Sequence, residues 1–155
     1  MENSGGRLVR ICVLAAIMMS VLAVGAPVAL AQSWWTGYRS FSIQGRDFKN
    51  RAAVTLFEDG TGCTARSECT YLDASSPRNG EMMMEPRLFN GSGVVIENDF
   101  YSSRAGERSI SWPTDKQGNN GWRYSKGITY QLLNDGENYA TTYTLETSHH
   151  YYDLW

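Results

Sequence analysis

The chain has 155 residues, and its 14 Lys and Arg against 16 Asp and Glu give a formal net charge of −2. Charges of both signs are interspersed along the chain, whereas nucleic-acid binders concentrate positive charge on one face. The composition therefore argues against a nucleic-acid partner, and the length suits one domain with a single core.

Residues 1–31 have the three parts of a secretory signal peptide in the expected order. Arg7 and Arg10 supply the positive start, and a run of Ile, Val, Leu, Ala and Met follows. This run falls short of the roughly 20 apolar residues that span a bilayer, and it ends in small residues, which favours cleavage over anchoring. We expect cleavage between Ala31 and Gln32 and export to an extracellular or periplasmic space.

Three cysteines are present, and Cys12 leaves with the signal peptide. The remaining pair, Cys63 and Cys69, is predicted to form a disulfide because the destination is oxidising. A metal site is disfavoured because two further ligands are missing nearby. The five residues between the cysteines, Arg66 among them, would then form a rigid loop that suits inhibition of a protein partner.

Short runs with a period of two recur along residues 32–155, separated by Gly, Asn and Asp. Strands are predicted at Ala53–Phe57, Thr70–Leu72, Val94–Tyr101 and Ser109–Trp112. The polar stretch 73–87, which contains the triplet Met82–Met84, is predicted to be a loop.

The last predicted element is a β-hairpin. The alternating runs Ile128–Leu133 and Tyr139–Leu145 flank a turn that contains Asp135-Gly136, and Asp-Gly between alternating runs is a strong hairpin signal. No segment shows apolar residues at helical spacing. We therefore predict a single all-β domain, built as an antiparallel β-sandwich or a small β-barrel.

Aromatic residues are unusually abundant, with nine Tyr and five Trp. Flat aromatic faces beside amide groups suit sugar rings, and Tyr and Trp also form hot spots at protein interfaces. The alternative is that they fill the core of the sandwich. The predicted binding residues are Trp34, Trp35, Trp112, Asn119, Asn120, Trp122 and Tyr124.

Candidate catalytic groups are sparse. His149 and His150 are adjacent and would point to opposite faces of a strand, so at most one of them can join Asp153. Glu97 and Asp99 would share one strand face about 7 Å apart, but the polar face of an antiparallel strand gives the same pattern. We predict no catalytic residue, no metal site and no cofactor.

The sequence thus predicts a secreted, non-catalytic β-domain that binds an extracellular glycan or protein through exposed aromatic residues. Three alternatives stay open. One is an inhibitor or effector of another protein that acts through the loop around Arg66. Another is a membrane-active protein, although negative charge disfavours anionic membranes. The third is a small hydrolase that uses carboxylates or His150.

Overall fold

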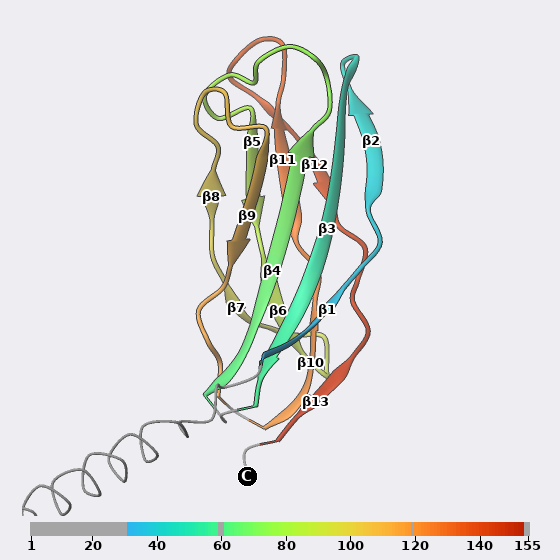
Figure 1. Ribbon diagram of the computed structural model, residues 1–155, viewed down its shortest axis with the longest axis vertical. Helices are drawn as coiled ribbons and strands as arrows, with labels where there is room; N and C mark the ends of the chain where they lie inside the picture. The colour runs from blue at the N-terminus through green and yellow to red at the C-terminus, as the bar shows by residue number, and fades with distance from the viewer. Residues whose placement is uncertain (1–30, 59–60, 119, 154–155) are drawn as a thin grey trace, which may run out of the picture.

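The protein is an antiparallel β-sandwich in the computed structural model, which describes residues 31–58, 61–118 and 120–153 (Figure 1). The described elements are all strands, so the all-β prediction is confirmed. The first layer contains β1 (Ala31–Trp35), β2 (Arg39–Ile43), β3 (Arg46–Phe57), β4 (Gly62–Tyr71) and β9 (Ser109–Pro113). Its order is β1-β3-β4-β9, with β2 pairing the first half of β3 and β1 the second half.

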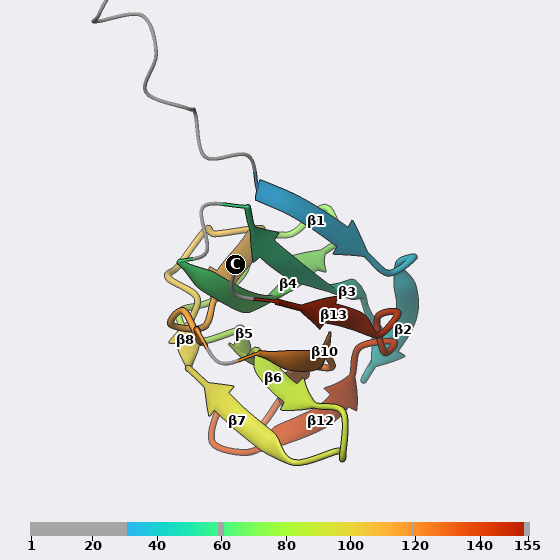
Figure 2. The same cartoon turned by 90° about the horizontal axis from the view of Figure 1, so that it is seen from below.

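The second layer consists of two four-stranded sheets placed end to end (Figures 1 and 2). The upper sheet in Figure 1 runs in the order β12 (Tyr139–Tyr143), β11 (Ile128–Leu132), β5 (Met82–Glu85) and β8 (Tyr101–Ser102). The lower sheet runs in the order β13 (His150–Tyr152), β10 (Gly121–Ser125), β6 (Arg87–Asn90) and β7 (Val95–Asn98). Each strand of one sheet continues a strand of the other, as β5 continues into β6 across Pro86.

The two layers approach each other closely at the break between β10 and β11. A Cβ atom added to Gly127 would lie 1.9 Å from the Ser67 Oγ on β4, so only glycine is accommodated there. Ser67 is fully buried. We call this contact, with the small and polar side chains around it, the waist of the sandwich.

The waist separates two apolar clusters. On β4 the inward side chains run from Tyr71 and Cys69 through Ser67 to Ala65 and Cys63. Tyr71 and Cys69 belong to an upper cluster that also contains Phe48, Met82, Met84 and Ile110. Ala65 and Cys63 belong to a lower cluster that also contains Val54, Leu88 and Tyr152. The core is therefore divided by the sequence of one central strand.

Threonine hydroxyl groups replace main-chain partners where the second layer is broken. The Thr144 Oγ1 accepts a hydrogen bond from the Gly127 amide at 2.9 Å, and the Thr147 Oγ1 accepts one from the Ser125 amide at 2.9 Å. Both threonine amides donate in return to the carbonyl oxygens of these residues at 3.0 Å. A buried, unpaired amide is costly, so these hydroxyls make the break tolerable.

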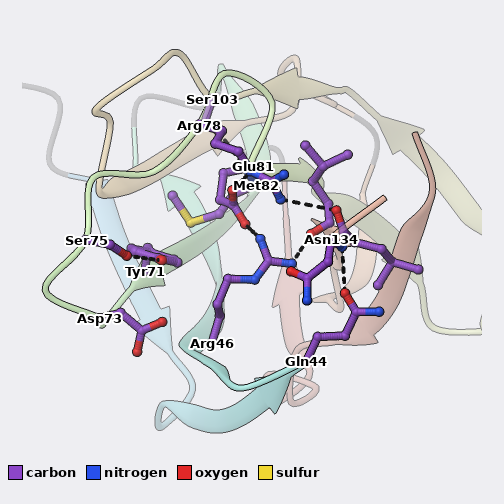
Figure 3. A network of polar contacts seen from close by, with 12 residues as sticks. Gln44, Arg46, Tyr71, Asp73, Ser75, Arg78, Glu81, Met82, Ser103 and Asn134 are labelled. Atoms are coloured by element: carbon purple, nitrogen blue, oxygen red, sulfur yellow. Dashed lines mark hydrogen bonds and ion pairs between the residues drawn. The ribbon is translucent and has the colours of Figure 1, made fainter. Parts of the chain in front are cut away.

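The upper end of the sandwich is closed by a buried carboxylate (Figure 3). Glu81 is 2% exposed and forms ion pairs with Arg46 and Arg78. The two guanidinium groups also donate to the carbonyl oxygens of Leu132 and Leu133, respectively, beside the β11–β12 turn. The negative charge of Glu81 is thus compensated by a guanidinium group on each side, as a buried ion requires.

The predicted hairpin is confirmed: β11 pairs with β12 in a register that places Leu132 opposite Tyr139. The predicted loop 73–87 is wrong in its second half, because Met82 and Met84 lie on β5 and fill the upper cluster. The predicted strand Val94–Tyr101 is divided into β7 and β8.

The predicted disulfide is wrong, because Cys63 and Cys69 are free and buried. They lie six residues apart on the continuous strand β4, which separates their Cα atoms by about 20 Å at the usual rise. A disulfide requires these atoms within about 7 Å. The rigid loop predicted around Arg66 is likewise absent, since these residues pair with β3 on one side and β9 on the other.

Thiol titration tests the unpaired state. A chain without residues 1–31, denatured without a reductant, should give two reactive thiols. In the native protein Cys69 should react slowly, because burial raises its pKa to about 12 and the thiolate is the reactive form. Fewer than two thiols in the denatured chain would show that a disulfide does form.

Substitution at the waist tests the close approach of the layers. Gly127→Ala should lower the free energy of unfolding by about 1–3 kcal/mol, because the added methyl group overpacks a filled interior. Urea denaturation measures this change. Gly118→Ala is the matched control, since a Cβ there meets nothing within 4 Å. Equal stability of the two variants would contradict the close approach of the two layers at Gly127.

Candidate functional site

A polar pocket of about 710 Å³ lies at the lower end of the sandwich, beside the start of β10. It is lined by side chains from the β6–β7 turn, from the segment before β10 and from β10 itself. Those that bear on its chemistry are Asn90, Ser92, Gln117, Asn120, Trp122 and Arg123. We call it the Trp122 pocket.

Trp122 is held in place by a packed turn and a neighbouring ring. Its side chain is 51% exposed, and its ring meets Tyr151 edge-on with 5.5 Å between centroids. A Cβ added to Gly91 would lie 2.9 Å from the Trp122 Cβ, so the turn packs directly against the base of the indole. The Asn90 Oδ1 fixes this turn by accepting hydrogen bonds from the amides of Ser92 and Val94, both at 3.0 Å.

Further side chains anchor the segment before β10. The Gln117 Nε2 donates to Glu97 at 2.5 Å, and the Asn120 Nδ2 donates to Asp153 at 2.8 Å. The Arg123 guanidinium, 4% exposed, donates to the carbonyl oxygens of Trp122 at 2.9 Å and Asn120 at 3.3 Å. These bonds give the pocket a defined shape before any ligand arrives.

Some polar groups around the pocket take no part in the hydrogen bonds that hold its shape. The Ser92 hydroxyl, the Gln117 Oε1 and the Trp122 Nε1 make no hydrogen bond to other residues that the structure describes. They offer a donor and acceptor set beside a flat aromatic face. Such a combination recognises hydroxyl groups on a ligand with an apolar side.

Cys63 lies behind this pocket, where burial disfavours the reactive thiolate form. Burial raises the pKa of its thiol, and the nearby Arg123 guanidinium only partly offsets this effect. The thiol donates a hydrogen bond to the Gln117 carbonyl oxygen at 3.3 Å. The protonated form is therefore held in a structural contact.

A second pocket, of about 350 Å³, opens on the other side of β13. Its aromatic lining is Trp34, Phe57, Tyr151 and Tyr152, and its acidic lining is Glu58 and Asp153. The Trp122–Tyr151 ring contact and the Asn120–Asp153 hydrogen bond join it to the Trp122 pocket. We call it the acidic pocket.

Two predicted binding residues close the open edges of the sandwich instead. Trp112 stacks on Tyr101 with 4.7 Å between centroids, and its Nε1 donates to Asp99 at 2.7 Å, joining β9 to the β7–β8 edge. Trp34 stacks on His150 with 3.8 Å between centroids, joining β1 to β13. Both indoles connect the two layers.

Two further predicted binding residues, Trp35 and Tyr124, do not join Trp122 in its pocket. Trp35 lies on the outer face of the first layer beneath the Arg51 guanidinium, 4.1 Å from its ring centroid. Tyr124 stacks between Phe89 and His149 on the outer face of the second layer. Asn119 lies outside the described residues. The structure thus brings together Asn120 and Trp122.

Sequence reasoning missed the contribution of the β6–β7 turn and of Arg123. Asn90-Gly91-Ser92-Gly93 was recognisable as a turn, but nothing local indicates that it packs against Trp122. Arg123 alternates with the outward-facing Trp122 and so points inward, and this period of two was the available signal.

The described residues contain neither a metal-ligand cluster nor a membrane-spanning helix. Within 31–58, 61–118 and 120–153, no group of three or more His, Cys, Asp or Glu is placed to hold a metal ion. In the same part of the chain no helix is long and apolar enough to cross a bilayer. Comparison with protein-family models, curated proteins and solved structures finds no match.

The partly buried imidazole of His150, beside the acidic pocket, predicts a pH dependence of stability. Burial lowers the pKa of His150 below 6.5, and the charge of His149 adds to this effect. The folded state then binds fewer protons than the unfolded state, so the free energy of unfolding should fall as the pH drops below about 6.5.

Denaturation of wild type and His150→Phe between pH 8 and pH 5 measures this effect. The variant keeps a ring against Trp34 and replaces a buried Nε2 that has no hydrogen-bond partner among the described residues. It should lose less stability than wild type on acidification. His149→Phe, at an exposed position that stacks on Tyr124, removes only the smaller cause and should lose nearly as much stability as wild type on acidification. Parallel profiles for wild type and His150→Phe would refute the prediction.

Proposed function

We propose that residues 32–155 form a secreted, non-catalytic domain that binds an extracellular glycan in the Trp122 pocket. The observation that carries this proposal is a half-exposed indole standing at the wall of a polar pocket. Sugar rings present C–H faces that stack on aromatic rings, while their hydroxyl groups need directed donors and acceptors.

The size and the preformed shape of the pocket support a small carbohydrate ligand. Its volume of about 710 Å³ falls within the roughly 300–1,000 Å³ typical of small-molecule sites. The turn beneath the indole and the segment before β10 are already hydrogen-bonded. Little ordering entropy would therefore be lost on binding.

The carboxylates around the pocket support binding without catalysis. Glu97 accepts a hydrogen bond from Gln117, and Asp153 accepts one from Asn120. Asp99, the other member of the predicted pair, accepts from the Trp112 indole at the sandwich edge. All three carboxylates thus hold framework side chains, Glu97 and Asp153 at the pocket and Asp99 at the sandwich edge, whereas a glycosidase needs two carboxyl groups flanking one bond.

A protein ligand is the second candidate, supported by the outer face of the second layer. Phe100, Trp122, Tyr143 and Tyr151 are exposed there, beside the stacked rings of Phe89, Tyr124 and His149. Exposed aromatic side chains are enriched in protein interfaces.

Binding to insoluble polysaccharides and to a panel of soluble oligosaccharides tests the glycan proposal. Wild type should bind at least one of them. Trp122→Ala should weaken this affinity about tenfold or more, a loss of about 1.4 kcal/mol. Gly91→Ala should weaken it in the same direction, because its Cβ would displace the indole.

Trp35→Ala is the matched control, since it removes another exposed indole, 40% accessible against 51% for Trp122, from the opposite layer. It should bind as wild type does. If wild type retains no polysaccharide or oligosaccharide, or if the two Trp variants lose affinity equally, the Trp122 pocket is not a glycan site.

A further inference from the structure

We propose that the acidic pocket binds the ammonium group of an amino sugar, as a second subsite of the glycan site at Trp122. The inference rests on the proposed glycan-binding function and names the class of glycan, one with free amino groups. Three observations support it: the residues that line the acidic pocket, their negative charge, and the contacts that connect them to Trp122.

The acidic pocket is the open mouth between the two layers at the β1–β13 edge. Pairing of β1 with β3 puts Gln32 opposite Leu56 and Trp34 opposite Val54 on the inner face of the first layer. The second layer contributes Tyr151, Tyr152 and Asp153 from β13 and the residue after it. The lower apolar cluster forms the inner wall of the acidic pocket.

The chemistry of the lining favours a cation. Glu58 and Asp153 supply two carboxylates beside aromatic rings, and no Lys or Arg is among the lining residues that the structure describes. Ammonium groups are attracted both to carboxylates and to aromatic faces. The face of Phe57 is already taken by the chain's own Lys116, whose Nζ lies 4.0 Å from the ring centroid, so the aromatic contacts left for a ligand are those of Trp34, Tyr151 and Tyr152.

The connection to Trp122 favours a sugar over a basic peptide. Tyr151 lines the acidic pocket and its ring contacts Trp122 directly, while Asp153 is hydrogen-bonded to Asn120 of the Trp122 pocket. One oligosaccharide can therefore stack on Trp122 and place a neighbouring amino group between Glu58 and Asp153. Residues 32–155 are also acidic overall, with 15 Asp and Glu against 12 Lys and Arg.

Isothermal titration calorimetry with residues 32–155 tests the proposal. The probes are a glucosamine hexamer and an N-acetylglucosamine hexamer, at low salt and at a pH where the free amines are protonated. The glucosamine hexamer should bind wild type at least about tenfold more tightly, and added salt should reduce that preference. The double variant Glu58→Gln/Asp153→Asn should bind the two hexamers equally.

Glu137→Gln is the matched control, because it removes an exposed carboxylate from the β11–β12 turn at the opposite end of the sandwich. It should keep the preference of wild type. A preference that survives the double variant, or that Glu137→Gln also abolishes, overturns the proposal. A lysine hexamer that binds as tightly as the glucosamine hexamer also overturns it, in favour of a basic peptide ligand.

The two proposals fail separately in these measurements. If Trp122→Ala weakens both hexamers while the double carboxamide variant changes neither, the glycan site stands and the amino-sugar subsite does not. If wild type binds neither these hexamers nor any other glycan, both are wrong. Far-ultraviolet circular dichroism of each variant confirms that it remains folded.

Discussion

The contact between Ser67 and Gly127 governs the architecture of this domain. Because the layers meet there with no room for a Cβ atom, large apolar side chains are excluded from the middle of the sandwich. The core is consequently divided into an upper and a lower cluster. The second layer breaks along the same line into two sheets, and buried threonine hydroxyls take over the hydrogen bonds that the break would leave unmade.

The two ends of the sandwich, on either side of this contact, differ in how they are closed. The upper end is closed by the buried Glu81 and its two arginines, which leave its charge fully matched. The lower end is held by bonds from Arg123, Gln117 and Asn120 that shape the loops without filling the space between them. Both pockets lie at this end.

Some aromatic side chains fill the core, as Phe48, Tyr71 and Tyr152 do, and the others serve two further purposes. Where the layers leave an open edge, a pair of stacked rings covers it, as Trp34 does with His150 and Trp112 with Tyr101. Elsewhere the rings stand on the outer faces, as Trp122 and Trp35 do. A sandwich built from short strands has long edges relative to its core. It therefore needs flat side chains that bury area without a deep interior.

The all-β class and the final hairpin followed from the sequence alone, because Asp-Gly between alternating runs acts locally. Trp122 and Asn120 were also recognisable as candidate ligand contacts. The alternation of Cys63, Ala65, Ser67 and Cys69 with polar residues marked a strand as well, but two cysteines after an expected signal peptide suggested a disulfide-closed loop. Only the tertiary structure decided which rings close edges, how Gly91 supports Trp122 and where the pockets open. These features depend on contacts between strands that are distant in the chain. The local periodicity of a sequence carries no information about such contacts.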